Sequence, residues 1–373
     1  MIHRTITANI ESDYHKGKVI VVLGPRQVGK TTLLQEIATQ HDAVFYNCDD
    51  EDVREMLTGA SSTELSQWLS NKKLVVIDEA QRVTNVGLIL KKIADLKLPT
   101  QVIATGSSSL DLNDKINEAA TGRLFHHHLF QFSTEELVAH NGLLEEKRML
   151  ENRLIYGMYP DVVTHFGDAE RLLRELSNSY LYKDLLSYQG IRKPDTLQKL
   201  VVALALQVGN IVSYNELAKT VGINRATVET YIDLLEKSFV VFRLSAFSRN
   251  PRNEISKGKK IYFYDTGVRN ALIHNYAPLS VRSDTGALWE NFIIAERLKC
   301  ITYHQRDVGL YFWRSNNQSE IDLIEEYQGQ IKAYEFKWNE KRSAKIPPSF
   351  TQTYGDVEFK VVTPSNYLDF LRE

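Results

Sequence analysis

Residues 19–31 read Val-Ile-Val-Val-Leu-Gly-Pro-Arg-Gln-Val-Gly-Lys-Thr, and this stretch decides the fold of the N-terminal part of the chain. The five apolar residues predict a buried parallel strand, and the next eight fit G-x-x-x-x-G-K-[ST] at every fixed position. The glycines let the backbone turn its N–H groups toward phosphates, and the dipole of the helix expected next favours the same negative charge. We therefore predict a phosphate-binding Walker A loop made of Gly24, Pro25, Arg26, Gln27, Val28, Gly29, Lys30, Thr31 and Thr32.

A matching acidic pair lies further along the chain. Residues 74–77, Leu-Val-Val-Ile, predict another buried strand, and Asp78 and Glu79 follow it directly. Ligands of open α/β sheets bind at the carboxyl ends of strands, where both carboxylates would lie. We expect Lys30 to contact the β- and γ-phosphates, Thr31 and Asp78 to hold Mg²⁺, and Glu79 to activate the attacking water. The sequence thus predicts both binding and hydrolysis of ATP.

Two further residues are candidates for this reaction. Ser107, in the Thr-Gly-Ser-Ser turn at 105–108, is assigned to the nucleotide site because a hydroxyl there could orient the water. A turn of small residues is an equally good interpretation. Arg123 is a candidate arginine finger acting on a nucleotide held by a neighbouring copy, which would require a homo-oligomer. A surface arginine is at least as well supported.

The pattern of predicted elements changes along the chain. Strands and helices alternate through residues 1–132, which predicts an α/β P-loop NTPase core of AAA-like type with a parallel sheet. Residues 133–190 are helical and are interpreted as a lid. Residues 191–270 give helix, turn, helix and two strands, the order of a winged helix-turn-helix. Residues 271–373 give a helix followed by strands, which predicts an α+β domain of restriction-endonuclease type.

The last domain contains residues with the spacing of a metal-dependent nuclease. Asp322 lies in one predicted strand, and Glu335 and Lys337 share a face of the next. With Glu290 on the preceding helix, Asp322 and Glu335 would hold Mg²⁺ or Mn²⁺, and Lys337 would position or deprotonate a water. This looks like the PD-(D/E)xK nuclease core. A half-exposed strand with ordinary Glu–Lys neighbours is the alternative, and such a fold can also lose its activity.

Taken together, these motifs resemble the bacterial and archaeal AAA-type ATPases that carry the C-terminal domain of unknown function DUF4143. The matching stretches cover nearly the whole chain: 24–31, 77–81, 104–108, 157–160, 180–184, 264–267 and 288–292. Met158 departs from the family pattern, which tends to have a second glycine there. The resemblance implies an AAA-like ATPase domain, a helical lid, a winged helix and a nuclease-like tail. It implies no settled biological role.

Composition limits the partners. The net charge is −2, so DNA contact would need a local patch, and the basic residues Arg249, Arg252, Lys257, Lys259 and Lys260 are the best candidate. A solvated loop is the alternative. No apolar run approaches the ~20 residues of a membrane span, and a cytoplasmic protein is expected. Two functions follow: an ATP-driven, nucleic-acid-processing protein, or a nucleotide-controlled switch whose inactive nuclease-like tail binds protein or DNA.

Overall fold

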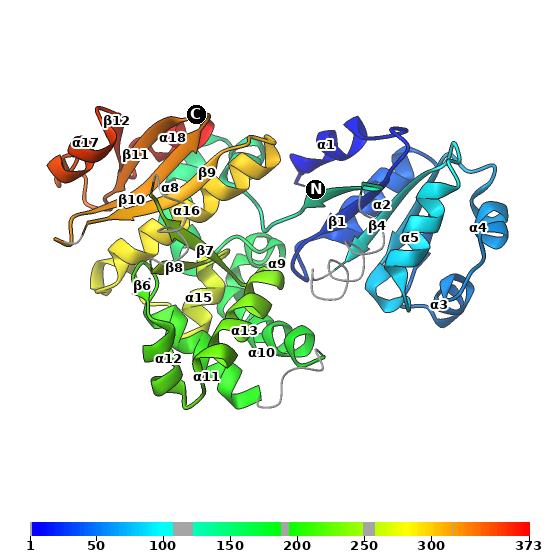
Figure 1. The fold of residues 1–373 in the computed structure, drawn as a ribbon, viewed down its shortest axis with the longest axis horizontal. Coiled ribbons are helices and arrows are strands. Elements are labelled where there is room, and N and C mark those ends of the chain that lie inside the picture. The colour runs from blue at the N-terminus through cyan, green and yellow to red at the C-terminus, as the bar shows by residue number, and fades with distance from the viewer. Residues whose placement is uncertain (1, 107–121, 188–193, 249–257, 316) are drawn as a thin grey trace. The chain divides into compact units, whose positions relative to one another are not determined.

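A computed structural model describes residues 2–106, 122–187, 194–248, 258–315 and 317–373 (Figure 1). The chain forms two compact units. We call Met1–Phe132 with Lys237–Phe239 the N-terminal unit, and Ser133–Glu236 with Val240–Glu373 the C-terminal unit. None of the described helices is both long and apolar enough to cross a lipid bilayer.

The N-terminal unit is built on a parallel sheet with the strand order β2-β3-β4-β1-β5. Its strands are β1 (Val19–Leu23), β2 (Val44–Asn47), β3 (Leu74–Asp78), β4 (Gln101–Gly106) and β5 (Leu124–His128). β1, β3 and β4 are fully buried, which is why they read as unbroken apolar runs. Because β4 pairs with both β1 and β3, the carboxyl ends of these three strands are neighbours at one edge. The parallel α/β sheet predicted from the sequence is confirmed.

Helices complete the N-terminal unit. They are α1 (Ile6–Ser12), α2 (Lys30–Gln40), α3 (Glu51–Leu57), α4 (Ser62–Leu69) and α5 (Val86–Asp95), with a 3₁₀ turn η1 at Ala80–Arg82. The buried faces of α2 and α5 pack against the sheet (Figure 1). α2 begins at Lys30 because Gly29 takes a left-handed conformation, with φ 89°, that ends the loop before it.

Helices make up much of the C-terminal unit. They are α7 (Thr134–Asn141), α8 (Leu143–Tyr156), α9 (Pro160–Thr164), α10 (Ala169–Ser187), α11 (Pro194–Leu206), α12 (Tyr214–Val221), α13 (Arg225–Lys237), α15 (Thr266–Leu272), α16 (Thr285–Tyr303), α17 (Pro348–Tyr354) and α18 (Tyr367–Arg372), with 3₁₀ turns η2 at Phe166–Asp168 and η3 at Leu279–Val281. Most of α13 belongs to this unit, and its last residue groups with the N-terminal unit. The helices expected between residues 133 and 237 are present in the described ranges.

A second sheet in this unit joins strands that the sequence assigned to different domains. Its order is β12-β11-β10-β9-β7-β8-β6. The strands are β6 (Ile211–Val212), β7 (Val241–Ala246), β8 (Lys259–Phe263), β9 (Gly309–Arg314), β10 (Glu320–Tyr327), β11 (Gln330–Phe336) and β12 (Glu358–Val362). β7 pairs in parallel with β9, at Ser245 and Tyr311. The boundary predicted at residue 270 therefore lies within one continuous sheet.

Candidate functional site

The phosphate loop leaves β1 through a glycine that no other residue can replace. A Cβ atom on Gly24 would lie 2.0 Å from the carbonyl oxygen of Leu129, the residue that follows β5. This close approach is part of the sheet, because Leu129 N–H donates to Leu23 O at 2.8 Å. Further along the loop, Gln27 and Gly29 have positive φ angles of 60° and 89°. The backbone thus takes the turned shape that the motif predicts.

The side chain of Lys30 is buried and packs against the backbone of this loop. Only 4% of the residue is exposed, and its Nζ donates to Gly24 O at 2.9 Å and to Pro25 O at 2.7 Å. Val28 is also buried, whereas Gln27 and Thr32 are exposed and Arg26 is half-buried. The lysine amine therefore lies against the loop backbone.

The two Walker motifs meet at Asp78. Thr31 Oγ1 donates to Asp78 Oδ2 at 2.7 Å, and Thr105 Oγ1 donates to Asp78 Oδ1 at 2.5 Å. Glu79 N–H donates to the same Thr105 hydroxyl at 2.9 Å. A hydroxyl and a buried carboxylate are oxygen donors of the kind Mg²⁺ prefers, so Thr31 and Asp78 fit the ion expected with a bound nucleotide. Thr105, at the end of β4, belongs to this group although only Ser107 of its turn was assigned from the sequence.

Glu79 is held in an unusual backbone conformation. Its φ and ψ are 52° and 39°, in the left-handed region that non-glycine residues rarely adopt. Its carboxylate accepts a hydrogen bond from the side-chain amide of Gln81. Strained backbone of this kind concentrates at functional sites, where surrounding contacts maintain it. Here the Thr105 hydroxyl is one such contact.

Arg4, which was not among the predicted site residues, also contacts the loop. The guanidinium donates from Nη1 to Val28 O at 2.7 Å and from Nη2 to Phe130 O at 2.5 Å. It lies 4.8 Å from the ring centroid of Phe132, and only 6% of the residue is exposed. Arg4 therefore ties the phosphate loop to the segment that follows β5. A basic residue in an apolar N-terminal segment was the only available signal.

Of the two remaining predicted residues, one cannot be placed and the other lies at the far end of the strands. Ser107 lies outside the residues that the structure describes. Arg123 precedes β5, where its Nε contacts Asp95 Oδ1 at 2.5 Å. Val19 pairs with Leu124, so Arg123 is at the amino end of the parallel strands. The phosphate loop leaves the opposite end, roughly 16 Å away at ~3.3 Å per residue. Arg123 cannot serve the nucleotide of its own chain, and its action on a neighbouring copy stays a prediction.

The four predicted nuclease residues lie on three adjoining elements of the C-terminal unit. Glu290 is on α16, Asp322 on β10, and Glu335 and Lys337 are at the end of β11. Asp322 Oδ2 accepts from Phe336 N at 2.8 Å, and Lys337 Nζ contacts Glu335 Oε1 at 2.6 Å. Burial first, and then the charges of Glu290 and Glu335, raise the pKa of the Asp322 carboxyl to about 8. The predicted residues are therefore close enough to interact.

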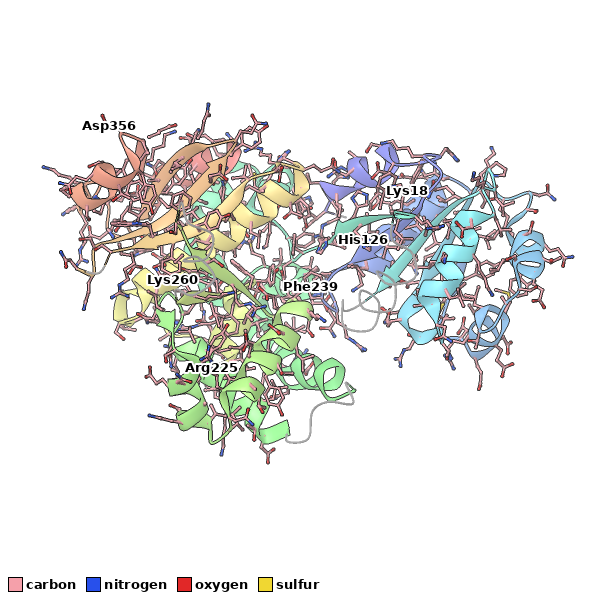
Figure 2. The ribbon with its side chains drawn as sticks, in the orientation of Figure 1. Lys18, His126, Arg225, Phe239, Lys260 and Asp356 are labelled. Carbon is pink, nitrogen blue, oxygen red and sulfur yellow. The ribbon has the colours of Figure 1, made fainter. Side chains whose placement is uncertain are left out.

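A buried lysine pairs with this acidic group. Lys260 on β8 (labelled in Figure 2) is 1% exposed, and its Nζ contacts Glu290 Oε1 at 2.8 Å. It also forms an ion pair with Glu320, and Tyr262 donates to Glu290 Oε1 at 2.6 Å. Burial acts to lower the pKa of Lys260, but Glu290 and Glu320 outweigh it and the pKa is raised.

The assignment of Lys260 to an exposed basic patch is therefore wrong. The reason is that Lys260 lies in a strand, where it shares one face with Tyr262 two residues on, instead of in a solvated loop. Arg249, Arg252 and Lys257 of that patch lie outside the described residues. The alternating run Lys-Ile-Tyr-Phe at 260–263 was the signal that could have identified the strand face.

The predicted Mg²⁺ or Mn²⁺ site at Glu290, Asp322 and Glu335 is not formed. Among the residues that the structure describes, no three His, Cys, Asp or Glu side chains are arranged to hold a metal ion. The carboxylates instead bind protein donors, which are the ammonium groups of Lys260 and Lys337 and the N–H of Phe336. The side chains at these positions do not fit a divalent ion.

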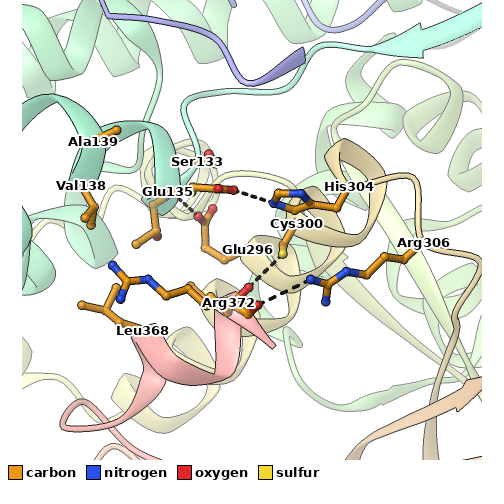
Figure 3. A pocket seen from close by; sticks show the side chains of 12 residues that line it. Ser133, Glu135, Val138, Ala139, Glu296, Cys300, His304, Arg306, Leu368 and Arg372 are labelled. Carbon is orange, nitrogen blue, oxygen red and sulfur yellow. Dashed lines mark hydrogen bonds and ion pairs between the residues drawn. The ribbon is translucent and has the colours of Figure 1, made fainter. Parts of the chain in front are cut away.

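A pocket of about 330 Å³ lies elsewhere in the C-terminal unit, between α7, α16 and α18 (Figure 3). On its rim His304 Nε2 lies 2.9 Å from Glu135 Oε2, and Thr134 N–H donates to Glu296 Oε2 at 2.6 Å. Cys300 Sγ donates to Leu371 O, and burial raises the pKa of its thiol. A protonated, hydrogen-bonded thiol is a poor nucleophile. The lining contains none of the residues predicted to be functional.

Comparisons with known proteins agree with the N-terminal geometry. Residues 16–138 match an AAA domain family, residues 147–279 the domain of unknown function DUF8612, and residues 285–368 the domain of unknown function DUF4143. Uncharacterized proteins of Mycobacterium tuberculosis and Mycobacterium bovis are each 27% identical, over 90% of this chain and 73% of theirs. A Walker-type ATPase of Pyrococcus abyssi has a similar fold, with a TM-score of 0.50, 15% identity, and coverage of 73% of this chain and 96% of that one.

Proposed function

We propose that this chain, which carries an AAA domain and a DUF4143 domain, hydrolyses ATP and uses its nucleotide state to control binding of a protein partner by the C-terminal unit. The observation that carries the first part is the group of contacts at the carboxyl ends of β1, β3 and β4. There Thr31 and Thr105 both donate to Asp78, next to the buried Lys30.

Hydrolysis would use these residues in distinct roles. The loop N–H groups and Lys30 bind the β- and γ-phosphates, for which the lysine amine exchanges its bonds to Gly24 O and Pro25 O. Thr31 and Asp78 would hold Mg²⁺, which when bound neutralises charge on the phosphate oxygens. Glu79 accepts the proton of the attacking water as general base. Any role of Arg123 requires a second copy of the chain.

The hydroxyl of Thr105 would connect two of these roles. It donates to the Asp78 carboxylate and accepts from Glu79 N–H, so one side chain orients both acidic residues. The side-chain amide of Gln81 holds the Glu79 carboxylate until the water takes its place. Fixed donors of this type lower the reorganisation needed during reaction.

The proposed controlled module is the region of α11 to α13 with the hairpin β7–β8, which we interpret as a winged helix. The start of α13 exposes residues of both signs, Arg225 and Glu229. Arg243 on the hairpin is neutralised by Asp233 at 2.7 Å and by Glu236. DNA-binding surfaces are strongly positive, whereas the described part of this surface carries charges of both signs, which favours a protein partner.

Metal-dependent cleavage of nucleic acid is the second candidate. It is supported by the proximity of three carboxyl groups, because the charges of Glu290 and Glu335 help to raise the pKa of Asp322. It is opposed by the protein donors that already bind these carboxylates. We therefore rank it below the switch.

One set of assays tests both candidates. Phosphate release from ATP is measured for wild type, Lys30→Ala and the control Lys73→Ala, which changes an exposed lysine of the same unit. We expect hydrolysis in wild type and the control and none in Lys30→Ala. Duplex, single-stranded and branched DNA are then incubated with wild type and Glu335→Ala in Mg²⁺ or Mn²⁺. Absence of ATP hydrolysis in wild type would reject the switch, and cleavage that Glu335→Ala abolishes would establish the nuclease.

A further inference from the structure

Three carboxylates of the C-terminal unit lie near the buried Lys260, and a fourth, Glu335, interacts with one of them, Asp322. Glu290 comes from α16, Glu320 and Asp322 from β10, and Glu335 from β11. Lys260 Nζ contacts Glu290 and Glu320. We call these five residues the lysine-centred cluster.

We propose that Lys260 supplies the positive charge that a divalent cation would supply in a nuclease with this order of elements, and that it closes the cluster to metal. The inference rests on the C-terminal part of the proposed function, because a cluster closed to metal cannot support metal-dependent cleavage. Its first support is contact: Lys260 and Tyr262 both donate to Glu290 Oε1, so protein donors already occupy this carboxylate oxygen.

The second support is the balance of charge. The three cluster carboxylates that form ion pairs carry a formal charge of −3, and Lys260, Lys337 and Arg314 contribute +3. The sum is −3 + 3 = 0. Loss of Lys260 alone would leave −1 and would take from Glu290 the ammonium group that pairs with it. The lysine therefore weakens the electrostatic reason for binding a divalent ion.

The third support is that Lys260 has no route away from the cluster. Its backbone pairs on both sides, with Leu244 of β7 and Ile211 of β6, so the strand cannot shift without breaking two ladders. The ammonium lies 5.6 Å from the ring centroid of Phe312 and is nearly without solvent contact. A metal would have to displace a buried charge that remains tethered beside it, which is costly.

The test measures Mn²⁺ binding to the whole 373-residue chain by electron paramagnetic resonance in the absence of nucleotide. Wild type, Lys260→Met and Lys260→Gln are compared, each with and without Asp322→Asn. We expect Lys260→Met to bind Mn²⁺ at least about tenfold more tightly than wild type, and Asp322→Asn to abolish the gain. Lys260→Gln removes the charge but keeps a hydrogen-bond donor. It should show the same gain in Mn²⁺ affinity, and it replaces Lys260→Met in the test if that variant fails to fold.

Lys337→Met is the matched control. Lys337 is also paired with a cluster carboxylate but is partly exposed, and its loss leaves Lys260 on Glu290 and Glu320. It should bind Mn²⁺ no more tightly than wild type. Asp322-dependent Mn²⁺ binding by wild type would overturn the proposal, as would an equal gain in Lys337→Met or no gain in either Lys260 variant. ATP hydrolysis by wild type is measured separately, so a failure of the ATPase proposal leaves this result readable.

Discussion

Replacing Arg4 by methionine tests whether a residue outside the Walker motifs shapes the phosphate loop. Methionine keeps an apolar side chain in the buried space but removes both hydrogen bonds, to Val28 O at 2.7 Å and to Phe130 O at 2.5 Å. A hydrogen bond to a charged group is worth about 1.5–3 kcal/mol, and loss of the contact with the Phe132 ring adds about 0.5–1 kcal/mol. Because neighbouring groups relax, we expect the N-terminal unit to lose about 3–5 kcal/mol of unfolding free energy.

Two measurements read this effect. Hydrogen exchange of the buried strand Val19–Leu23, measured as urea is raised, reports on the N-terminal unit. Hydrogen exchange at residues 24–31 reports on the loop itself. Arg82→Met is the control, because Arg82 is half exposed and its ion pair with Asp49 is worth at most about 1 kcal/mol. The KM for ATP should rise in Arg4→Met and stay unchanged in the control. Loss of less than about 1 kcal/mol, with wild-type exchange in the loop, would show that Arg4 does not fix it.

Three other changes test separate parts of the argument. Gly24→Ala places a Cβ 2.0 Å from Leu129 O, so it should abolish binding of a fluorescent ATP analogue, whereas Gly286→Ala, with open space at its Cβ, should not. Thr105→Val removes the hydrogen bonds to Asp78 and Glu79 and should lower kcat for ATP hydrolysis by about 10–100-fold with little change in KM. Thr105→Ser keeps the hydroxyl, so a kcat as low as that of Thr105→Val would contradict the proposed role of this hydroxyl. The pKa of Asp322 is raised from its ordinary value of 3.8 to about 8 in the folded chain. Between about pH 4 and 8 the folded state therefore keeps a proton that the unfolded state releases, so the free energy of unfolding should fall as pH rises through this range. Thermal unfolding of Asp322→Asn across this range should be flatter than wild type, and an equal slope in both would contradict the assignment.

Local patterns predicted the elements around Lys30 and Asp78 because each element is a continuous stretch of sequence. The strand, loop and helix around Lys30 form one continuous stretch, and Asp78 directly follows an apolar run that can only be a buried strand. Arg4 could not be predicted in the same way. Its partners lie 24 and 126 residues away, and nothing in the sequence near Arg4 indicates them.

The C-terminal cluster shows the opposite outcome. The spacing of Asp322, Glu335 and Lys337 correctly indicated that their side chains would be close, because adjacent strands bring them together. Whether three carboxylates hold a metal depends on what else reaches them. Lys260 lies on β8, which pairs with β7, and the pairing of β7 with β9 brings both strands next to the acidic residues. This long-range pairing cannot be predicted from the pattern of each strand. The acidic residues were thus found, and their counter-ion was not.

The continuous sheet of the C-terminal unit also affects how fragments of this chain behave. A fragment beginning at residue 271 would lack β7 and would leave β9 as an open edge, ready to pair with another molecule. The same cut would remove Lys260 and Tyr262 and leave Glu290 without either partner. Metal binding or cleavage detected in such a fragment would therefore be a property created by the truncation, and only the full chain reports the native chemistry of these carboxylates.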